Sequence, residues 1–159
     1  MPSQESVTAP DRTCLIGRVL SPVRYTIRED DIHDYLSVAG EEQAAFLSDE
    51  KAQAAGYERR VIPPSFAPFV AVQALLQAFD WERDFLFNYR TGTAMFGEQE
   101  LEYLRPLYVG ETLTVRSEVA NVYEKKGKNT FDVIQVHFTA TDDSEVVALQ
   151  GAQSYILFK

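Results

Sequence analysis

The chain has 159 residues, of which 45% are hydrophobic and 25% are charged, values typical of one soluble globular domain. Its formal charge of −9 and its isoelectric point near 4.7 argue against nucleic acid and anionic membrane surfaces, because both attract basic protein faces. Cys14, the single cysteine, cannot form an internal disulfide, and the polar N-terminus contains no apolar signal segment. We therefore expect a cytoplasmic protein.

The first residues predict a tail followed by two short strands. Residues 1–12 are polar and contain two prolines, so we expect a flexible tail there and a single domain over residues 13–159. Apolar runs predict strands at Leu15–Leu20 and Val23–Ile27, which Ser21-Pro22 separates.

Three helices are predicted next. Acidic residues from Glu29 to Asp31 favour a helix start, and Gly40 favours its end. A second, short helix is expected over Asp49–Ala55. The segment Ser65–Phe79 contains no charged residue, and the polar residues in its interior are two glutamines four positions apart. A surface helix has a broad polar face, so this segment is expected to be a core helix that is covered on nearly every side.

The last third of the chain predicts a long antiparallel sheet. Four strand-like runs are separated by short segments rich in glycine, asparagine and aspartate: Ala94–Leu107, Glu111–Tyr123, Thr130–Thr141 and Glu145–Phe158. Apolar and polar residues alternate clearly in the second and third runs, which indicates one buried face. Because one apolar helix must cover this face, we expect an α+β architecture in which the sheet curls around the helix, the hot-dog fold.

Two segments carry a likeness to a known family. FGEQELEYLRPLYVGETLTV, residues 96–115, and AAGYERRVIPPSFAPF, residues 54–69, resemble parts of MaoC-like dehydratases, in particular their N-terminal, FAS1-type half. The order of predicted elements also matches from about Val23 to the C-terminus. The resemblance implies a single hot-dog domain that binds acyl thioesters of coenzyme A or an acyl carrier protein and needs no cofactor.

The resemblance also identifies the segment where catalytic residues are expected. Active members of this family have a loop of the approximate form G-D-x-N-P-x-H, whose aspartate and histidine act as general acid and base. The matching segment here begins at Gly40 and places Glu41 at the aspartate position and Phe46 at the histidine position. Glutamate can substitute for aspartate, but phenylalanine transfers no proton. No Asp/His dyad is therefore expected in this chain.

The conformation of this segment is open to two predictions. An aspartate and a histidine five positions apart point in different directions on a helix, so an active dyad requires a broken loop. Residues 43–45, Gln-Ala-Ala, are good helix formers and allow the helix to continue. The sequence leaves both forms possible.

Substrate-binding residues are expected near the start of the core helix and on the first long strand. Free N–H groups at a helix start can polarise a thioester carbonyl, although the prolines here can simply begin the helix. With Ser65 as the N-cap, the N–H groups of Phe66, Ala67 and Phe69 are expected to be free. An arginine pair can bind the phosphates of the acyl carrier. The expected set is Ser65, Phe66, Ala67, Arg59, Arg60, Phe96, Gly97 and Gln99.

Other candidate residues have simpler interpretations. His33 and His137 are expected on the surface, and with one cysteine they give no metal-ligand spacing, so no metal site is expected. Glu98 and the two glutamates that alternate with it share one strand face, which predicts a solvated edge or, as in hot-dog thioesterases, a catalytic carboxylate. The aromatic segment Trp81–Tyr89 predicts an acyl channel, a dimer contact or a lid over the core.

Three functions follow from the sequence. The first is a substrate-binding subunit of an (R)-3-hydroxyacyl or enoyl thioester dehydratase, a lyase, which completes the acyl channel of a catalytic hot-dog partner. The second is a self-sufficient homodimer, either a hydratase that uses Glu41 or a thioesterase that uses Glu98. The third is an acyl-thioester-binding module without chemistry. Pairing with a like or unlike hot-dog chain is expected because a hot-dog sheet has an exposed edge strand.

Overall fold

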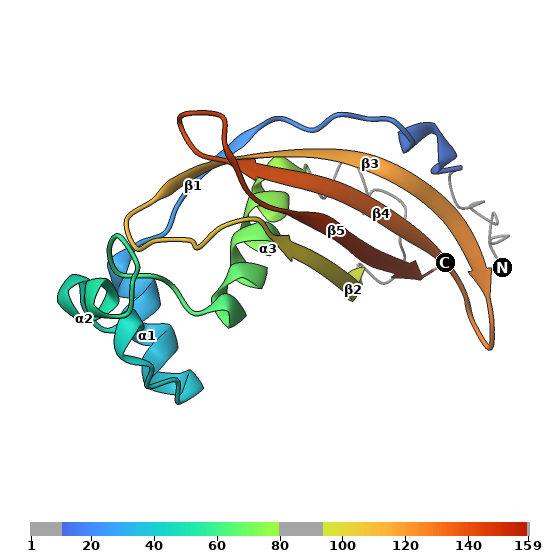
Figure 1. Ribbon diagram of the computed structural model, residues 1–159. Coiled ribbons are helices and arrows are strands. Elements are labelled where there is room, and N and C mark those ends of the chain that lie inside the picture. The colour runs from blue at the N-terminus through green and yellow to red at the C-terminus, as the bar shows by residue number, and fades with distance from the viewer. Residues whose placement is uncertain (1–10, 80–93, 159) are drawn as a thin grey trace, which may run out of the picture.

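The computed structural model describes residues 11–79 and 94–158, and its centre is one antiparallel sheet. The sheet contains five strands in the order β1-β3-β4-β5-β2, so β1 and β2 form its two edges. It arches over the central helix α3, as Figure 1 shows. This arrangement confirms the predicted α+β hot-dog fold. The strands are β1 (Val23–Thr26), β2 (Ala94–Tyr103), β3 (Thr112–Lys126), β4 (Thr130–Thr141) and β5 (Val147–Phe158).

Strands β3, β4 and β5 are long and form most of the sheet. The alternation predicted for β3 and β4 is confirmed, because Leu113, Val115 and Val119 of β3 are buried and Ile134 and Val136 of β4 are buried beside them. Each of these strands pairs with its neighbour along nearly its whole length. The concave face of the sheet therefore provides one wall of the core.

Helix α3 (Ala67–Ala78) provides the other wall of the core. It follows a 3-10 turn at Pro64–Phe66 and buries its small residues and Leu75 against the sheet. The prediction of burial on nearly every side is wrong, because the side chains of Phe69 and Leu76 are 48% and 43% exposed. The single chain has no described element that covers this side of the helix. None of the described helices is long and apolar enough to cross a membrane.

Two shorter helices lie together at one end of the sheet (Figure 1). Helix α1 (Glu29–Ala39) begins at three acidic residues and ends at Gly40, whose φ of 70° is left-handed and suits glycine. Helix α2 (Asp49–Ala54) begins at Ser48, whose hydroxyl accepts a hydrogen bond from the Lys51 N–H at 3.3 Å. Both predicted helices are confirmed within one residue at their ends.

The N-terminal part of the chain differs from the predictions. The strand expected at Leu15–Leu20 is absent: residues Thr13–Leu15 form a 3-10 turn, and Val19 makes one isolated bridge to β3. Arg12 was expected in the flexible tail, but its guanidinium is buried and lies 2.7 Å from the Asp132 carboxylate of β4. The folded domain therefore includes Arg12. Residues 1–10 of the predicted tail and the aromatic segment 81–89 lie outside the described residues.

Candidate functional site

The loop after α1 meets the 3-10 turn that precedes α3. Glu41 directly follows the helix-ending Gly40, and Ser65 lies in the turn Pro64–Phe66. The Ser65 hydroxyl donates a hydrogen bond to the Glu41 carboxylate. Two residues that the sequence singled out, 24 positions apart, are thus brought into direct contact. Ser65 is not the N-cap of α3, because its side chain is engaged with Glu41 and the cap position belongs to Phe66.

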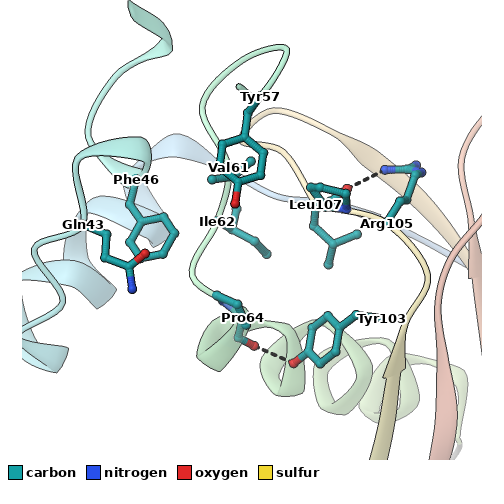
Figure 2. Close-up of a pocket in the computed structure, with 10 residues that line it drawn as sticks. Gln43, Phe46, Tyr57, Val61, Ile62, Pro64, Tyr103, Arg105 and Leu107 are labelled. Carbon is teal, nitrogen blue, oxygen red and sulfur yellow. Dashed lines mark hydrogen bonds between the residues drawn. The ribbon is translucent and has the colours of Figure 1, made fainter. Parts of the chain in front are cut away.

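A cavity of about 340 Å³ is lined by Gln43 and Pro64, which are close to Glu41 and Ser65 in the chain (Figure 2). Its walls come from the loop after α1, the segment before α3, and the connection from β2 to β3. Most of the lining is apolar or aromatic, which suits a hydrocarbon chain better than a charged ligand. The lining residues are Gln43, Phe46, Tyr57, Val61, Ile62, Pro64, Tyr103, Arg105, Pro106 and Leu107.

Phe46 forms part of the cavity wall and part of a small core. It ends the 3-10 turn Ala44–Phe46 and packs with Ala45, Ala52 and Val61. The alternative that α1 continues through this segment is wrong, because Gly40 ends the helix and the next turn is separate from it. The loop is therefore broken as in an active site of the resembled family, but a buried phenyl ring lies where that family has a histidine.

The cavity contains few groups that can transfer a proton. The Tyr103 hydroxyl donates to the Pro64 carbonyl at 2.6 Å, and burial raises its pKa above the usual value of tyrosine. Both histidines of the chain lie elsewhere: His33 is exposed on α1, and His137 is exposed on β4, on the sheet face that points away from α3. Glu41 lies at the edge of the site. Among the described carboxylates, it is the one nearest in the chain to the position of the expected dyad.

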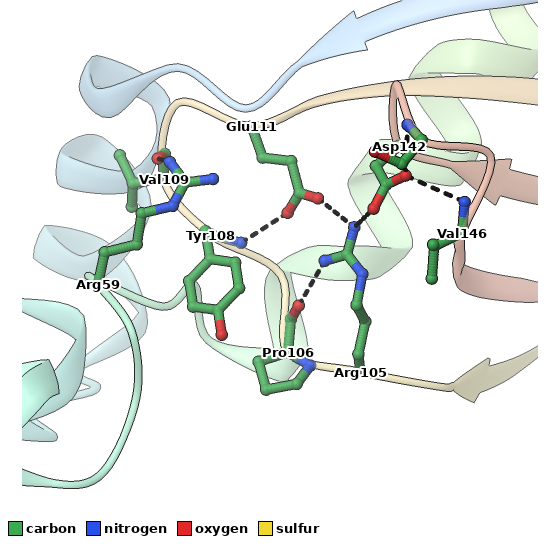
Figure 3. Close-up of polar contacts among 9 residues, drawn as sticks. Arg59, Arg105, Pro106, Tyr108, Val109, Glu111, Asp142 and Val146 are labelled. Carbon is green, nitrogen blue, oxygen red and sulfur yellow. Dashed lines mark hydrogen bonds and ion pairs between the residues drawn. The ribbon is translucent and has the colours of Figure 1, made fainter.

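An ion network holds the wall that follows β2 (Figure 3). The guanidinium of Arg105 donates to the Glu111 carboxylate and, at 3.0 Å, to Asp142 in the turn from β4 to β5. The second oxygen of Glu111 accepts from the Tyr108 N–H at 3.0 Å. The Glu111 hydrogen bond is the main cause of the raised pKa of Arg105. Arg105 and Glu111 lie in the segment 96–115 that carries the family likeness, but the sequence did not predict that they stabilise the cavity wall.

The start of α3 offers fewer free N–H groups than predicted. The N–H of Phe66 donates to the Pro63 carbonyl at 2.9 Å, and the N–H of Ala67 donates to the Pro64 carbonyl. Both N–H groups are therefore hydrogen-bonded within the 3-10 turn before α3 begins. In this conformation these two N–H groups are not free to polarise a carbonyl, so the expectation from the sequence is wrong for them.

The two arginines before α3 have different environments. Arg60 donates to the Phe46 carbonyl at 2.6 Å and to the Glu29 carboxylate at 2.9 Å, so it joins the loop to α1. Arg59 is exposed and lies 5.0 Å from the centre of the Tyr108 ring. Only Arg59 presents its guanidinium at the surface, where a phosphate can reach it.

The candidates on β2 divide between the two faces of the sheet. Phe96 packs edge-to-face on Tyr155 at 5.8 Å, and Gln99 pairs with Gln153, so both lie on the α3 side. Gly97 lies at the bulge between them, where a Cβ atom would come within 3.2 Å of Ile156. Glu98 is exposed and points away from α3. This position argues against Glu98 as a thioesterase carboxylate beside the central helix.

The comparisons with known proteins agree with the fold. Residues 14–150 match the family model of the FAS1-like dehydratase domain region. The chain belongs to this family. Membership assigns it, at a coarse level, to the hydro-lyase type of dehydratases and hydratases.

Individual relatives are distant. A UPF0336 protein of Streptomyces griseus is 26% identical over 119 residues, which cover 74% of this chain and 77% of that protein. A chain of the HadBC (3R-hydroxyacyl-ACP dehydratase) complex of Mycobacterium tuberculosis has a TM-score of 0.71 at 20% identity and covers 89% of this chain and 96% of its own. A chain of the ChsH1-ChsH2 complex of the same organism has a TM-score of 0.65 at 16% identity, with 89% and 84% covered. The two solved structures show that the fold is shared.

Proposed function

We propose that this protein is the acyl-thioester-binding subunit of an (R)-3-hydroxyacyl or enoyl thioester dehydratase, and that a second hot-dog subunit supplies the catalytic Asp/His dyad. One observation carries the proposal: the broken loop of the family is present, but the buried ring of Phe46 lies where the proton-transferring histidine is expected. Without a base of this kind, the addition of water across the C2–C3 double bond loses about 10²–10⁴-fold in rate.

An incomplete surface supports the existence of a partner. Phe69 and Leu76 of α3 are half-exposed, and β2 is an edge strand with one row of backbone groups free for pairing. Phe96 and Tyr103 of β2 are exposed on the same side. A second hot-dog subunit that pairs with β2 buries these apolar side chains and extends the sheet. The HadBC and ChsH1-ChsH2 structures are complexes of unlike chains with this fold.

The cavity supports the binding of an acyl group. Its lining of aromatic and aliphatic side chains suits a hydrocarbon chain, and the exposed Arg59 lies beside the connection from β2 to β3. In the assembled enzyme, this subunit holds part of the acyl chain while the partner adds the proton at C2 and the hydroxyl group at C3.

A self-sufficient hydratase is the second candidate, and the contact of Glu41 with Ser65 favours it. This contact holds a carboxylate beside the start of α3, where a general base is expected. In this candidate Glu41 alone activates the water. A thioesterase that uses Glu98 is disfavoured because Glu98 points away from α3, and a binding module without any catalytic partner remains the third outcome of the test.

Hydration assays separate these candidates. The purified chain is mixed with crotonyl-CoA, octenoyl-CoA and dodecenoyl-CoA, and loss of the enoyl absorbance is followed with and without a catalytic hot-dog subunit that co-purifies with it. We expect binding of the longer thioesters without turnover by the chain alone, and turnover by the complex. The proposal would be overturned if the chain alone hydrated these thioesters, if Glu41→Gln abolished this activity, and if the control Glu42→Gln retained it. Thioester cleavage would indicate a thioesterase instead.

A further inference from the structure

Two glutamine side chains lie on the inner face of the sheet among apolar neighbours. Gln99 of β2 and Gln153 of β5 are opposite one another in the paired strands. Gln153 alternates in phase with Leu149 and Tyr155, which belong to the two core clusters. Since alternate residues of a strand share a face, both glutamines point toward α3.

Each glutamine has a buried amide nitrogen, and no described residue accepts a hydrogen bond from it. Gln153 is 0% exposed, and its Nε2 atom has no partner. Its Oε1 atom accepts from the Tyr155 hydroxyl at 2.8 Å, so one end of the amide is engaged and the other end is not. The Nε2 atom of Gln99 is buried and unpartnered as well. Native proteins leave few buried polar groups unpaired, so two adjacent cases require an explanation.

The surroundings of Gln99 suit an acyl chain. Along the inner face of β2, Gln99 lies between Phe96 and Tyr103, which are both half-exposed. Tyr103 reaches the mouth of the cavity through its bond to Pro64. Tyr103 is four positions from Gln99 along β2, a distance of about 13 Å. A chain that extends from the cavity along β2 therefore passes the two amides.

We infer that Gln99 and Gln153 bind an oxygen atom in the acyl chain, remote from the thioester, so that the preferred substrates are oxygenated acyl thioesters. The inference rests on the proposed function, because it requires the acyl group to lie against β2. A carbonyl or hydroxyl oxygen accepts hydrogen bonds from the amide nitrogens, which a hydrocarbon chain leaves unpaired. The protein thereby distinguishes chains of equal length by one polar atom.

Binding to chain-matched thioesters tests the inference. The full chain is titrated with stearoyl-CoA, 6-ketostearoyl-CoA and 12-ketostearoyl-CoA below their critical micelle concentrations. An extended chain advances about 1.2 Å per bond, so with the thioester at the Tyr103 mouth of the cavity, an oxygen beside Gln99, about 13 Å away, corresponds to the C12 position. We expect the 12-keto thioester to bind roughly tenfold more tightly than stearoyl-CoA, and the 6-keto thioester to show no gain.

Matched variants assign the effect to the two amides. Gln99→Met and Gln153→Met keep the length of the side chain and remove its hydrogen-bonding groups. They should abolish the preference for the 12-keto thioester, retain stearoyl-CoA binding within twofold, and unfold at the same or a higher temperature. Gln135→Met, on the outer face of β4, is the control and should retain the preference.

The outcomes separate the two proposals. Equal binding of all three thioesters, or a preference that both methionine variants retain, overturns the inference and leaves the amides as a site for water. A chain that binds none of the three overturns the proposed function and this inference with it.

Discussion

At the scale of the residue, Phe46 has a structural role in the small core beside the cavity. Its ring packs with Ala45, Ala52 and Val61 and lines the cavity. Phe46→Ala is expected to lower the free energy of unfolding by about 3–5 kcal/mol, because it removes a buried ring and leaves a void. Urea denaturation measures the change. Phe69→Ala, at a half-exposed position of α3, is the control, and an equal loss there would contradict this assignment.

The buried ion pair between Arg12 and Asp132 gives a second prediction at this scale. The two side chains are 4% and 6% exposed, so removal of one partner breaks an ion pair that is shielded from solvent. Asp132→Ala is expected to cost about 3–5 kcal/mol in urea denaturation. The double variant Arg12→Met, Asp132→Leu should recover most of this loss, since both charges of the pair are then removed. A double variant as unstable as the single one would show that the pair contributes more than charge balance.

The sequence predicts residue identities at the site better than their contacts. It singled out Glu41, Phe46 and Ser65 from a likeness to known loops, and the structure brings all three to one region. It did not predict that Ser65 binds Glu41, because a hydrogen bond between residues so far apart in the chain depends on how α1 and α3 pack. The pair Arg12 and Asp132 was missed for the same reason.

At the scale of the element, the turn between β4 and β5 is held by Asp142. Its carboxylate accepts from the N–H groups of Val146 and Ser144, and its other oxygen accepts from Arg105. These bonds, with the Val146 N–H as the largest cause, lower the pKa of Asp142 below its usual value. A lowered pKa means that the stabilisation is complete above the ordinary carboxyl pKa and is lost as the pH falls through the lowered value.

This titration predicts how stability depends on pH. The urea midpoint of the native chain should fall between pH 5 and pH 3, and Asp142→Asn should reduce that fall and start from a lower midpoint at pH 7. Asp143→Asn, in the same turn but exposed beside Arg24, is the control and should keep the native pH dependence. Parallel curves for the native chain and Asp142→Asn would rule out this contribution of Asp142.

Regular elements followed from the sequence wherever one periodicity dominated. The run Thr130–Thr141 is β4 without any change of bounds, because alternation and flanking turn residues agree there. The strand expected at Leu15–Leu20 is absent, because a short apolar run becomes a strand only where a neighbour pairs with it over several residues, and the pairing with β3 is limited to residues 17–20 and forms one isolated bridge, at Val19. Propensity also misled at residues 43–45, where the left-handed Gly40 ends the helix despite good helix formers beyond it.

At the scale of the whole molecule, the described part of the single chain leaves one side of α3 uncovered. The sequence of α3 implied cover on nearly every side, and the isolated chain leaves Phe69 and Leu76 exposed on one side. Both facts agree if the missing cover belongs to another chain. The apolar character of α3 thus reflects both the fold and the assembly. The sequence alone does not show which apolar residues serve the fold and which serve the assembly.

The exposed side of α3 gives the prediction that tests this assembly. Leu76→Glu places a charge where the proposed partner would exclude water, so we expect at least a tenfold weaker association with the proposed catalytic hot-dog subunit, measured by analytical ultracentrifugation. The variant should fold normally, because Leu76 is already 43% exposed in the single chain. Val38→Glu, at a position on α1 that is 88% exposed, is the control and should associate as the native chain does. Unchanged association of Leu76→Glu would mean that the partner binds elsewhere, and loss of association in both variants would indicate a general effect of added negative charge on a chain of net charge −9.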